Sequence, residues 1–148
     1  MNLKEMIRNN QAKATLSTLW IFILLNLIFR DIHEFFRFGL LEEITTGVVN
    51  GTAITEELLL VAGIILEIPL AMVVLARLLP YRVNRFANML AAILMFLILL
   101  GNGYNDLDDV WFLGVNCLAT VGIIYFSYKW KEKDVLKTRE QVVSSPLI

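Results

Sequence analysis

Four long apolar runs, separated by short polar links, constrain the fold of this chain more than any other feature. The runs cover residues 15–36, 54–79, 86–101 and 110–128, and 57% of the 148 residues are hydrophobic. About 20 helical residues cross a hydrocarbon core of about 30 Å, so these runs predict membrane-spanning helices. We therefore expect an all-α fold: one membrane domain over residues 1–148, an antiparallel bundle of four transmembrane helices with a cytoplasmic tail at 129–148.

The distribution of basic residues predicts how the chain is threaded. Of the 13 Lys and Arg residues, all but Arg30 and Arg37 lie before the first run, around the link between the second and third runs, or after the fourth. Because Lys and Arg accumulate in cytoplasmic segments next to membrane spans, both termini are expected in the cytoplasm of a multi-pass plasma-membrane protein. The lipid bilayer is then its first partner, and a homo-oligomer is compatible with the sequence.

The first run carries polar side chains in its second half, which is unusual for a membrane helix. Asn26, Arg30 and His33 recur at helical spacing, and Glu34 lies one turn from Arg30. Charged residues inside a bilayer are costly and usually face the interior of a bundle or a water-filled cavity. This pattern therefore predicts a polar spine that faces the other helices.

Counting depth along the helices predicts a partner for Arg30. At a rise of about 1.5 Å per residue, Glu67 lies about 18 Å from the inner boundary, and Arg30 and Asn116 lie about 21 Å from it. An arginine at this level would keep the carboxylate ionised and would itself be neutralised. We expect an Arg30–Glu67 ion pair, with Arg30–Glu34 as the alternative, and hydrogen bonds from Asn26 and Asn116.

The other runs also carry polar or small residues on one face, and we expect those faces to point inward. In the second run the face includes Glu56 and Glu67, in the third Asn88 and Asn102, and in the fourth Asn116. Together they predict an outward-facing pocket for a small solute or ion. Its candidate residues are Asn26, Arg30, His33, Glu34, Glu56, Glu67, Asn102 and Asn116.

Two functional interpretations follow from this pocket. In the first, the protein binds or transports a small solute or cation, because an acidic outer mouth surrounds the polar spine. In the second, it is a non-catalytic accessory or scaffold protein, and the buried ion pair only fixes how the helices pack. No motif of a known enzyme is present, so an enzymatic activity is not expected.

The sequence gives little indication that the protein binds a cofactor, a metal ion or nucleic acid. His33, Glu56 and Asp106 could contribute metal ligands, but Asp31 and His33 lie about 200° apart on a helix and cannot chelate together. With a single histidine, bis-histidine haem ligation within one chain is excluded. The net charge of −1 and the absence of a basic face argue against nucleic-acid binding. We therefore expect no cofactor and assign no metal site.

Short motifs in three of the runs resemble those of a bacterial family of uncharacterised four-span membrane proteins. They are Leu16-Ser17-Thr18-Leu19-Trp20 and Asp31 in the first run, Ile68-Pro69 and Met72 in the second, and Pro80, Asn84-Arg85 and Asn88 around the link to the third. The resemblance covers roughly residues 14–131. It implies four helices and carries no established activity.

Overall fold

The computed structural model describes residues 3–101 and 107–130. Within these residues five helices and a two-stranded ribbon follow in chain order: α1 (Leu3–Glu34), α2 (Leu40–Thr46), β1 (Val48–Val49), β2 (Thr52–Ala53), α3 (Glu56–Leu78), α4 (Tyr81–Gly101) and α5 (Leu107–Lys129). The all-α class is confirmed. Two boundaries differ from expectation, because α1 already begins at Leu3 and α4 at Tyr81.

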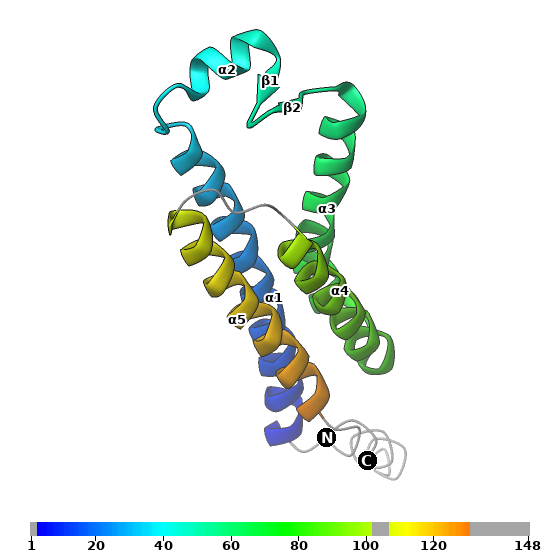
Figure 1. The fold of residues 1–148 in the computed structure, drawn as a ribbon. Coiled ribbons are helices and arrows are strands. Elements are labelled where there is room, and N and C mark those ends of the chain that lie inside the picture. The colour runs from blue at the N-terminus through cyan, green and yellow to red at the C-terminus, as the bar shows by residue number, and fades with distance from the viewer. Residues whose placement is uncertain (1–2, 102–106, 131–148) are drawn as a thin grey trace, which may run out of the picture.

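The helices run lengthwise between two chemically different ends (Figure 1). At one end, here called the capped end, α2 and the β1–β2 ribbon join α1 to α3. At the other, here called the terminal end, α1 begins and α5 finishes, and the short link Leu79–Pro80 joins α3 to α4. α1 packs on both α3 and α5, and α4 packs on α5 and, less extensively, on α3.

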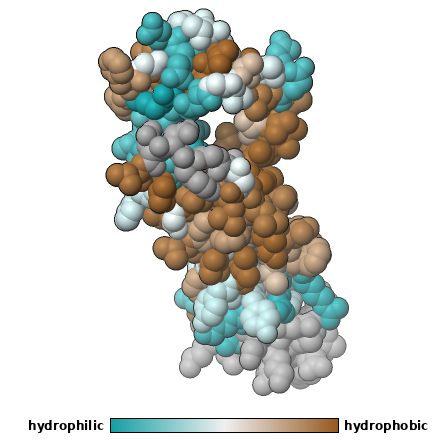
Figure 2. Space-filling view, viewed as in Figure 1, coloured by the Kyte–Doolittle hydropathy of each residue, from teal (hydrophilic) through white to brown (hydrophobic). Residues whose placement is uncertain are grey.

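Four helices, α1, α3, α4 and α5, are long and apolar enough to cross a membrane. Their outward surfaces expose many large hydrophobic side chains, such as Leu118 at 75% and Leu59 at 60%. Figure 2 shows this apolar surface as a broad region between hydrophilic ends. A soluble monomer rarely exposes so large an apolar surface, whereas lipid tails cover it without cost. The chain therefore has the helices and the surface of an integral membrane protein.

The buried core lies in the part of the molecule toward the terminal end. It contains Trp20 and Ile23 of α1, Met95 of α4 and Ile123 of α5, each fully enclosed. The expected inward faces of α4 and α5 are confirmed, since Asn88 and Asn116 are buried with their stripes.

The expected inward faces of α1 and α3 were wrong. α1 buries Leu16, Trp20 and Ile23, a face that Arg30 shares but that is rotated from Asn26 and His33, and α3 buries Pro69, Met72 and Ala76 while Glu56 and Glu67 are exposed. The reason is that Trp20 and Ile23 of α1 and Met72 of α3 belong to one buried apolar cluster. Apolar side chains, and not the polar ones, therefore make the contact between these helices.

A buried hydrogen-bond network ties three helices together in this core. Trp20 donates from Nε1 to Oδ1 of Asn88 at 2.7 Å, and Asn88 donates from Nδ2 to Oδ1 of Asn84 at 2.6 Å. Asn84 in turn donates to the carbonyl oxygens of Ala76 and Leu79, which are among the carbonyls left without partners where α3 ends. Buried polar groups arranged in this way fix the packing, because each loss leaves an unsatisfied partner.

The capped end is built from tight turns. Gly39 and Gly47, both in the left-handed region at φ 83° and 74°, flank α2, and such a backbone favours glycine. Between the strands, Asn50 and Gly51 have φ 50° and 75°, as a type I′ hairpin turn requires. The segment from Arg37 to Ala53 therefore folds back on itself as a small ordered unit.

Candidate functional site

Arg30 forms an ion pair with Asp109, which corrects the expected Arg30–Glu67 pair. The guanidinium Nε donates to Oδ1 of Asp109 at 2.7 Å, across from α1 to α5. The Asp109 side chain is 4% exposed and that of Arg30 is 30% exposed. Neither Glu67 nor the alternative Glu34 is the partner found in the described part of the chain.

The correction follows from the length of α1. α1 begins at Leu3 and ends at Glu34, and it crosses the molecule at its own angle (Figure 1). Arg30 therefore lies beside the first turn of α5, where Asp109 is located. An arginine at this level is near the end of the apolar region rather than at its middle.

The remaining candidates on α1 do not gather around Arg30. Asn26 donates from Nδ2 to the carbonyl oxygen of Phe22 in its own helix at 2.9 Å. The ring of His33 makes an edge contact with Phe112 of α5, with 5.5 Å between ring centroids. Glu34 pairs instead with Arg37, one turn further along.

Four of the candidates outside α1 are either exposed or outside the described residues. Glu56 and Glu67 are exposed on α3 and contribute to no ion pair among the described residues. Asn102 and Asp106 lie outside the described residues. Within the described ranges, no group of three or more His, Cys, Asp and Glu side chains could hold a metal ion. The pocket made of these eight residues thus stays a prediction.

The two arginines of the capped end differ in how their donors are used. Arg37 donates from Nε to Glu34 at 2.5 Å and from both terminal nitrogens to Glu43 at 3.1 and 3.0 Å. Arg30 donates only from Nε to Asp109 among the described residues, so its two terminal nitrogens keep their donors. Arg37 therefore acts as a structural connection, whereas Arg30 can still bind another group.

Arg37 and Glu43 hold the loop at the capped end in place. Glu43 also accepts a hydrogen bond from the backbone N–H of Asn50 at 3.0 Å, so one carboxylate joins the segment after α1, α2 and the ribbon turn. The Arg37 guanidinium, followed by the Asn50 amide, lowers the pKa of Glu43 below its ordinary 4.5. The hydrogen bonds from Arg37 to Glu43 and Glu34 raise the pKa of Arg37. Both groups are therefore charged at neutral pH.

The helices separate above the core, on the side of Arg30. Arg30 lies seven residues beyond Ile23, so the two share a face of α1, but Ile23 is fully buried and Arg30 is partly exposed. Ala62 lies seven residues before Pro69 on α3 and likewise shares its face, yet Pro69 is buried and Ala62 is exposed. The facing sides of α1 and α3 thus lose contact toward the capped end. Figure 2 shows the resulting opening between α3 and the column that contains α1.

One further polar group lies below the ion pair on α5. Asn116 follows Asp109 by seven residues, so it lies on the same face about 10 Å deeper. Its side chain is 1% exposed, and its Oδ1 has no hydrogen-bond partner within the described part of the chain. A buried acceptor without a partner is costly, which makes this atom a site where a bound molecule or water would stabilise the protein.

Asp109, Trp20 and Asn84 are the residues that sequence reasoning did not place in the site or the core network. Asp109 directly precedes the fourth apolar run, where its position suggests only an acid of the polar link. A usable signal existed, since Asp109 and Asn116 share the helical face that the fourth run turns inward. Trp20, Asn84 and Asn88 all occur in the motifs that carry the family resemblance, and the structure connects them.

Of three comparisons with known proteins, one gives a match. No curated protein and no solved structure matches the chain. Residues 3–137 match the family of unknown function DUF6326, which covers most of the sequence and all four apolar helices. The chain therefore belongs to the DUF6326 family of unknown function.

Proposed function

We propose that this membrane protein binds a small solute through Arg30, in the opening between α1 and α3 at the capped end. The observation that carries the proposal is the state of the guanidinium. Among the residues that the structure describes, Asp109 holds the guanidinium by Nε and its two terminal nitrogens have no acceptor. The Arg30 side chain is also 30% exposed, so a solute can reach it.

The chemistry of Arg30 favours a carboxylate or phosphate group in the solute. A guanidinium presents its terminal donors as a rigid fork that matches two oxygen atoms. Asp31, Glu34 and Glu43 are close along the chain and add negative charge, which disfavours a simple anion. The proposal therefore favours a solute that also carries a positive group, such as a zwitterion. Asn116 supplies an unused acceptor deeper along α5.

The binding proposal can be tested with the purified full chain in detergent. Melting curves are recorded with acetate, inorganic phosphate and glycine, and the affinity of each stabilising compound is titrated. Arg30→Gln is expected to weaken binding at least tenfold, since charge-assisted hydrogen bonds contribute about 1.5–3 kcal/mol. Arg37→Gln is the matched control, because its donors already bind Glu34 and Glu43. Stabilisation that is unaffected by Arg30→Gln would contradict the proposal.

A second candidate function, that of an accessory or scaffold protein, is favoured by the network at the terminal end. Trp20, Asn88 and Asn84 satisfy one another and the end of α3, so the hydrogen-bonding groups of this network are used within the protein. On this alternative, Arg30 and Asp109 likewise only fix α1 against α5. It predicts no solute whose binding depends on Arg30. Transport, as distinct from binding, would require this network to open.

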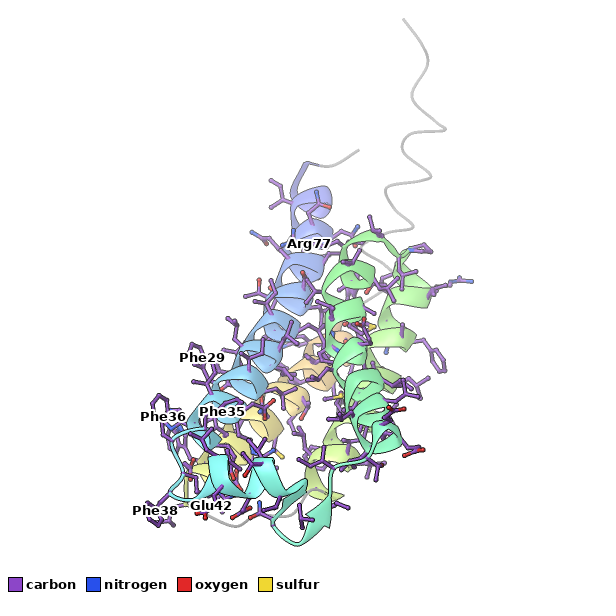
Figure 3. The ribbon with its side chains drawn as sticks, turned by 90° about the horizontal axis from the view of Figure 1, so that it is seen from above. Phe29, Phe35, Phe36, Phe38, Glu42 and Arg77 are labelled. Carbon is purple, nitrogen blue, oxygen red and sulfur yellow. The ribbon has the colours of Figure 1, made fainter. Side chains whose placement is uncertain are left out.

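The orientation of the protein in the membrane is part of the same proposal. We infer that the terminal end faces the cytoplasm and that the capped end faces outward. The basic side chains Lys13, Arg77, Arg82 and Arg85 lie along the helices near the terminal end, and the acids Glu42, Glu43, Glu56 and Glu57 lie near the capped end. In Figure 3 Arg77 and Glu42 are far apart, at opposite ends of the helices. The preference of Lys and Arg for the cytoplasmic side supports this direction.

A further inference from the structure

A second pocket lies at the terminal end, between α4 and α5, and is unrelated to Arg30. It is open, has a volume of about 430 Å³, and is lined by Arg85, Tyr125, Tyr128 and Lys129. Arg85 belongs to the early part of α4, and the other three belong to the end of α5. Two cations and two phenol rings therefore meet where the apolar surface of these helices ends.

Aromatic rings and one backbone carbonyl hold both cations in place. Arg85 donates from Nη2 to the carbonyl oxygen of Tyr128 at 3.2 Å, and its guanidinium carbon lies 5.8 Å from the centre of the Tyr128 ring. Lys129 donates from Nζ to the hydroxyl of Tyr125 at 2.9 Å and lies 5.2 Å from the centre of that ring. The positions of both positive charges are thus fixed before any ligand arrives, which lowers the entropic cost of binding.

The two charges lack a counterion in the part of the chain that the structure describes. None of the ion pairs found among the described residues involves Arg85 or Lys129. Arg85 and Lys129 are therefore a pair of positive groups at a membrane boundary, where an anion would be strongly favoured. Tyrosine is also enriched at this level, because its ring prefers the apolar region and its hydroxyl the headgroups.

We propose that this pocket binds the headgroup of an anionic phospholipid. Arg85 can offer its remaining nitrogens to two phosphate oxygens, and Lys129 adds a point charge from the other side. The Tyr125 hydroxyl accepts from Lys129, so its own hydrogen is available to the phosphate. The net charge of +2 selects a headgroup with a net negative charge over a zwitterionic one.

The surface of α5 above the pocket explains why the occupant is a lipid rather than free phosphate. Leu118 and Val121 lie on the same helical face as Tyr125 and are exposed at 75% and 52%. They help to line an apolar hollow of about 570 Å³ that extends to Gly114, where no atom would meet an added Cβ within 4 Å. An acyl chain attached to a headgroup at Lys129 would run along this hollow. One phospholipid molecule can therefore occupy both the cationic pocket and the apolar hollow, whereas inorganic phosphate can occupy only the pocket.

The test uses the purified full chain in detergent with palmitoyl-oleoyl-phosphatidylglycerol as the probe. Bound lipid is counted by native mass spectrometry, which does not depend on the stability of each variant. Arg85→Gln and Lys129→Gln are each expected to weaken binding about fivefold, the effect of about 1 kcal/mol per basic residue at an anionic surface. Arg77→Gln is the matched control, since Arg77 is exposed near the same end and does not line the pocket.

Each alternative gives a different result in the same experiment. Equal binding of palmitoyl-oleoyl-phosphatidylcholine would show that the two cations do not select charge, and would overturn the proposal. An equal loss of binding in Arg77→Gln would attribute the effect to the general charge of the terminal end, and inorganic phosphate that competes fully would remove the role of the hollow. Spectra with two copies of the chain and no lipid would assign the surface to a protein contact. Selective loss in Arg85→Gln and Lys129→Gln supports the site, whatever the outcome at Arg30.

Discussion

Arg30 and Asp109 join the end of α1 to the start of α5 through one hydrogen bond of 2.7 Å, although 79 residues separate them in the chain. The aspartate is buried and the arginine is partly exposed, so the pair has a protected side and an open side. Its protected side connects two helices. Its open side is the part of the molecule to which we assign binding.

The stability of the protein is expected to depend on this pair in a non-additive way. Arg30→Met leaves the buried carboxylate of Asp109 without its cation, and should lower the free energy of unfolding by about 1–3 kcal/mol. The double variant Arg30→Met/Asp109→Leu should recover at least half of that loss, because apolar side chains are tolerated at this position between helices. Reversible unfolding in detergent micelles measures the single variants Arg30→Met and Asp109→Leu and the double variant. Equal and additive losses would show that the two residues do not interact.

The buried amide network should be far more sensitive to substitution than an asparagine on the helix surface. Asn88→Ala removes the acceptor of the Trp20 Nε1–H and the donor to Oδ1 of Asn84. It should lower the free energy of unfolding by about 2–4 kcal/mol. Asn26→Ala is the control, since Asn26 bonds only to the backbone of its own helix, and should change it by less than about 0.5 kcal/mol. Similar effects of the two substitutions would mean that the network contributes no specific stability.

Some features of this fold can be predicted from the sequence and others cannot. The number and position of the spans follow from hydrophobic length, and the inward faces of α4 and α5 follow from helical spacing. The partner of Arg30 does not, because it depends on the tilt of α1 and on where α5 begins. Glu67 looked like a partner by depth alone, yet it lies on an exposed face of α3. The Asn50-Gly51 hairpin was readable in principle, since this dipeptide between short β-branched segments favours a type I′ turn.

The loop at the capped end is expected to loosen at low pH. Because Arg37 and the Asn50 amide lower the pKa of Glu43 below 4.5, this carboxylate stabilises the folded loop above that pH. The stabilisation is lost as the pH falls through the lowered pKa and the carboxylate is protonated. Hydrogen exchange of the α2 and ribbon amides, corrected for intrinsic rates, should therefore rise in acid. Glu43→Gln should remove this dependence and Glu42→Gln should keep it; a dependence that survives in Glu43→Gln would assign it to another group.

The inferred threading gives a simple prediction for fusion proteins. A reporter enzyme that is active only outside the cytoplasm should be inactive when it is fused after Ile148, because both termini are placed in the cytoplasm. The same reporter inserted after Gly47, a glycine in the loop of the capped end, should be active. An active terminal fusion would reverse the assignment of the two ends.

The opening at the capped end is the central claim, and cysteine accessibility tests it most directly. In a Cys117→Ser background, Ala62→Cys places a thiol on the face of α3 that turns toward α1, and Ile64→Cys places one about 200° away, toward lipid. Both positions are exposed in the structure. If water fills the opening, a membrane-impermeant thiol reagent applied from the capped side should react at least tenfold faster with the thiol at position 62. Equal rates at the two positions would show that lipid fills the opening, and would contradict a solute site at Arg30.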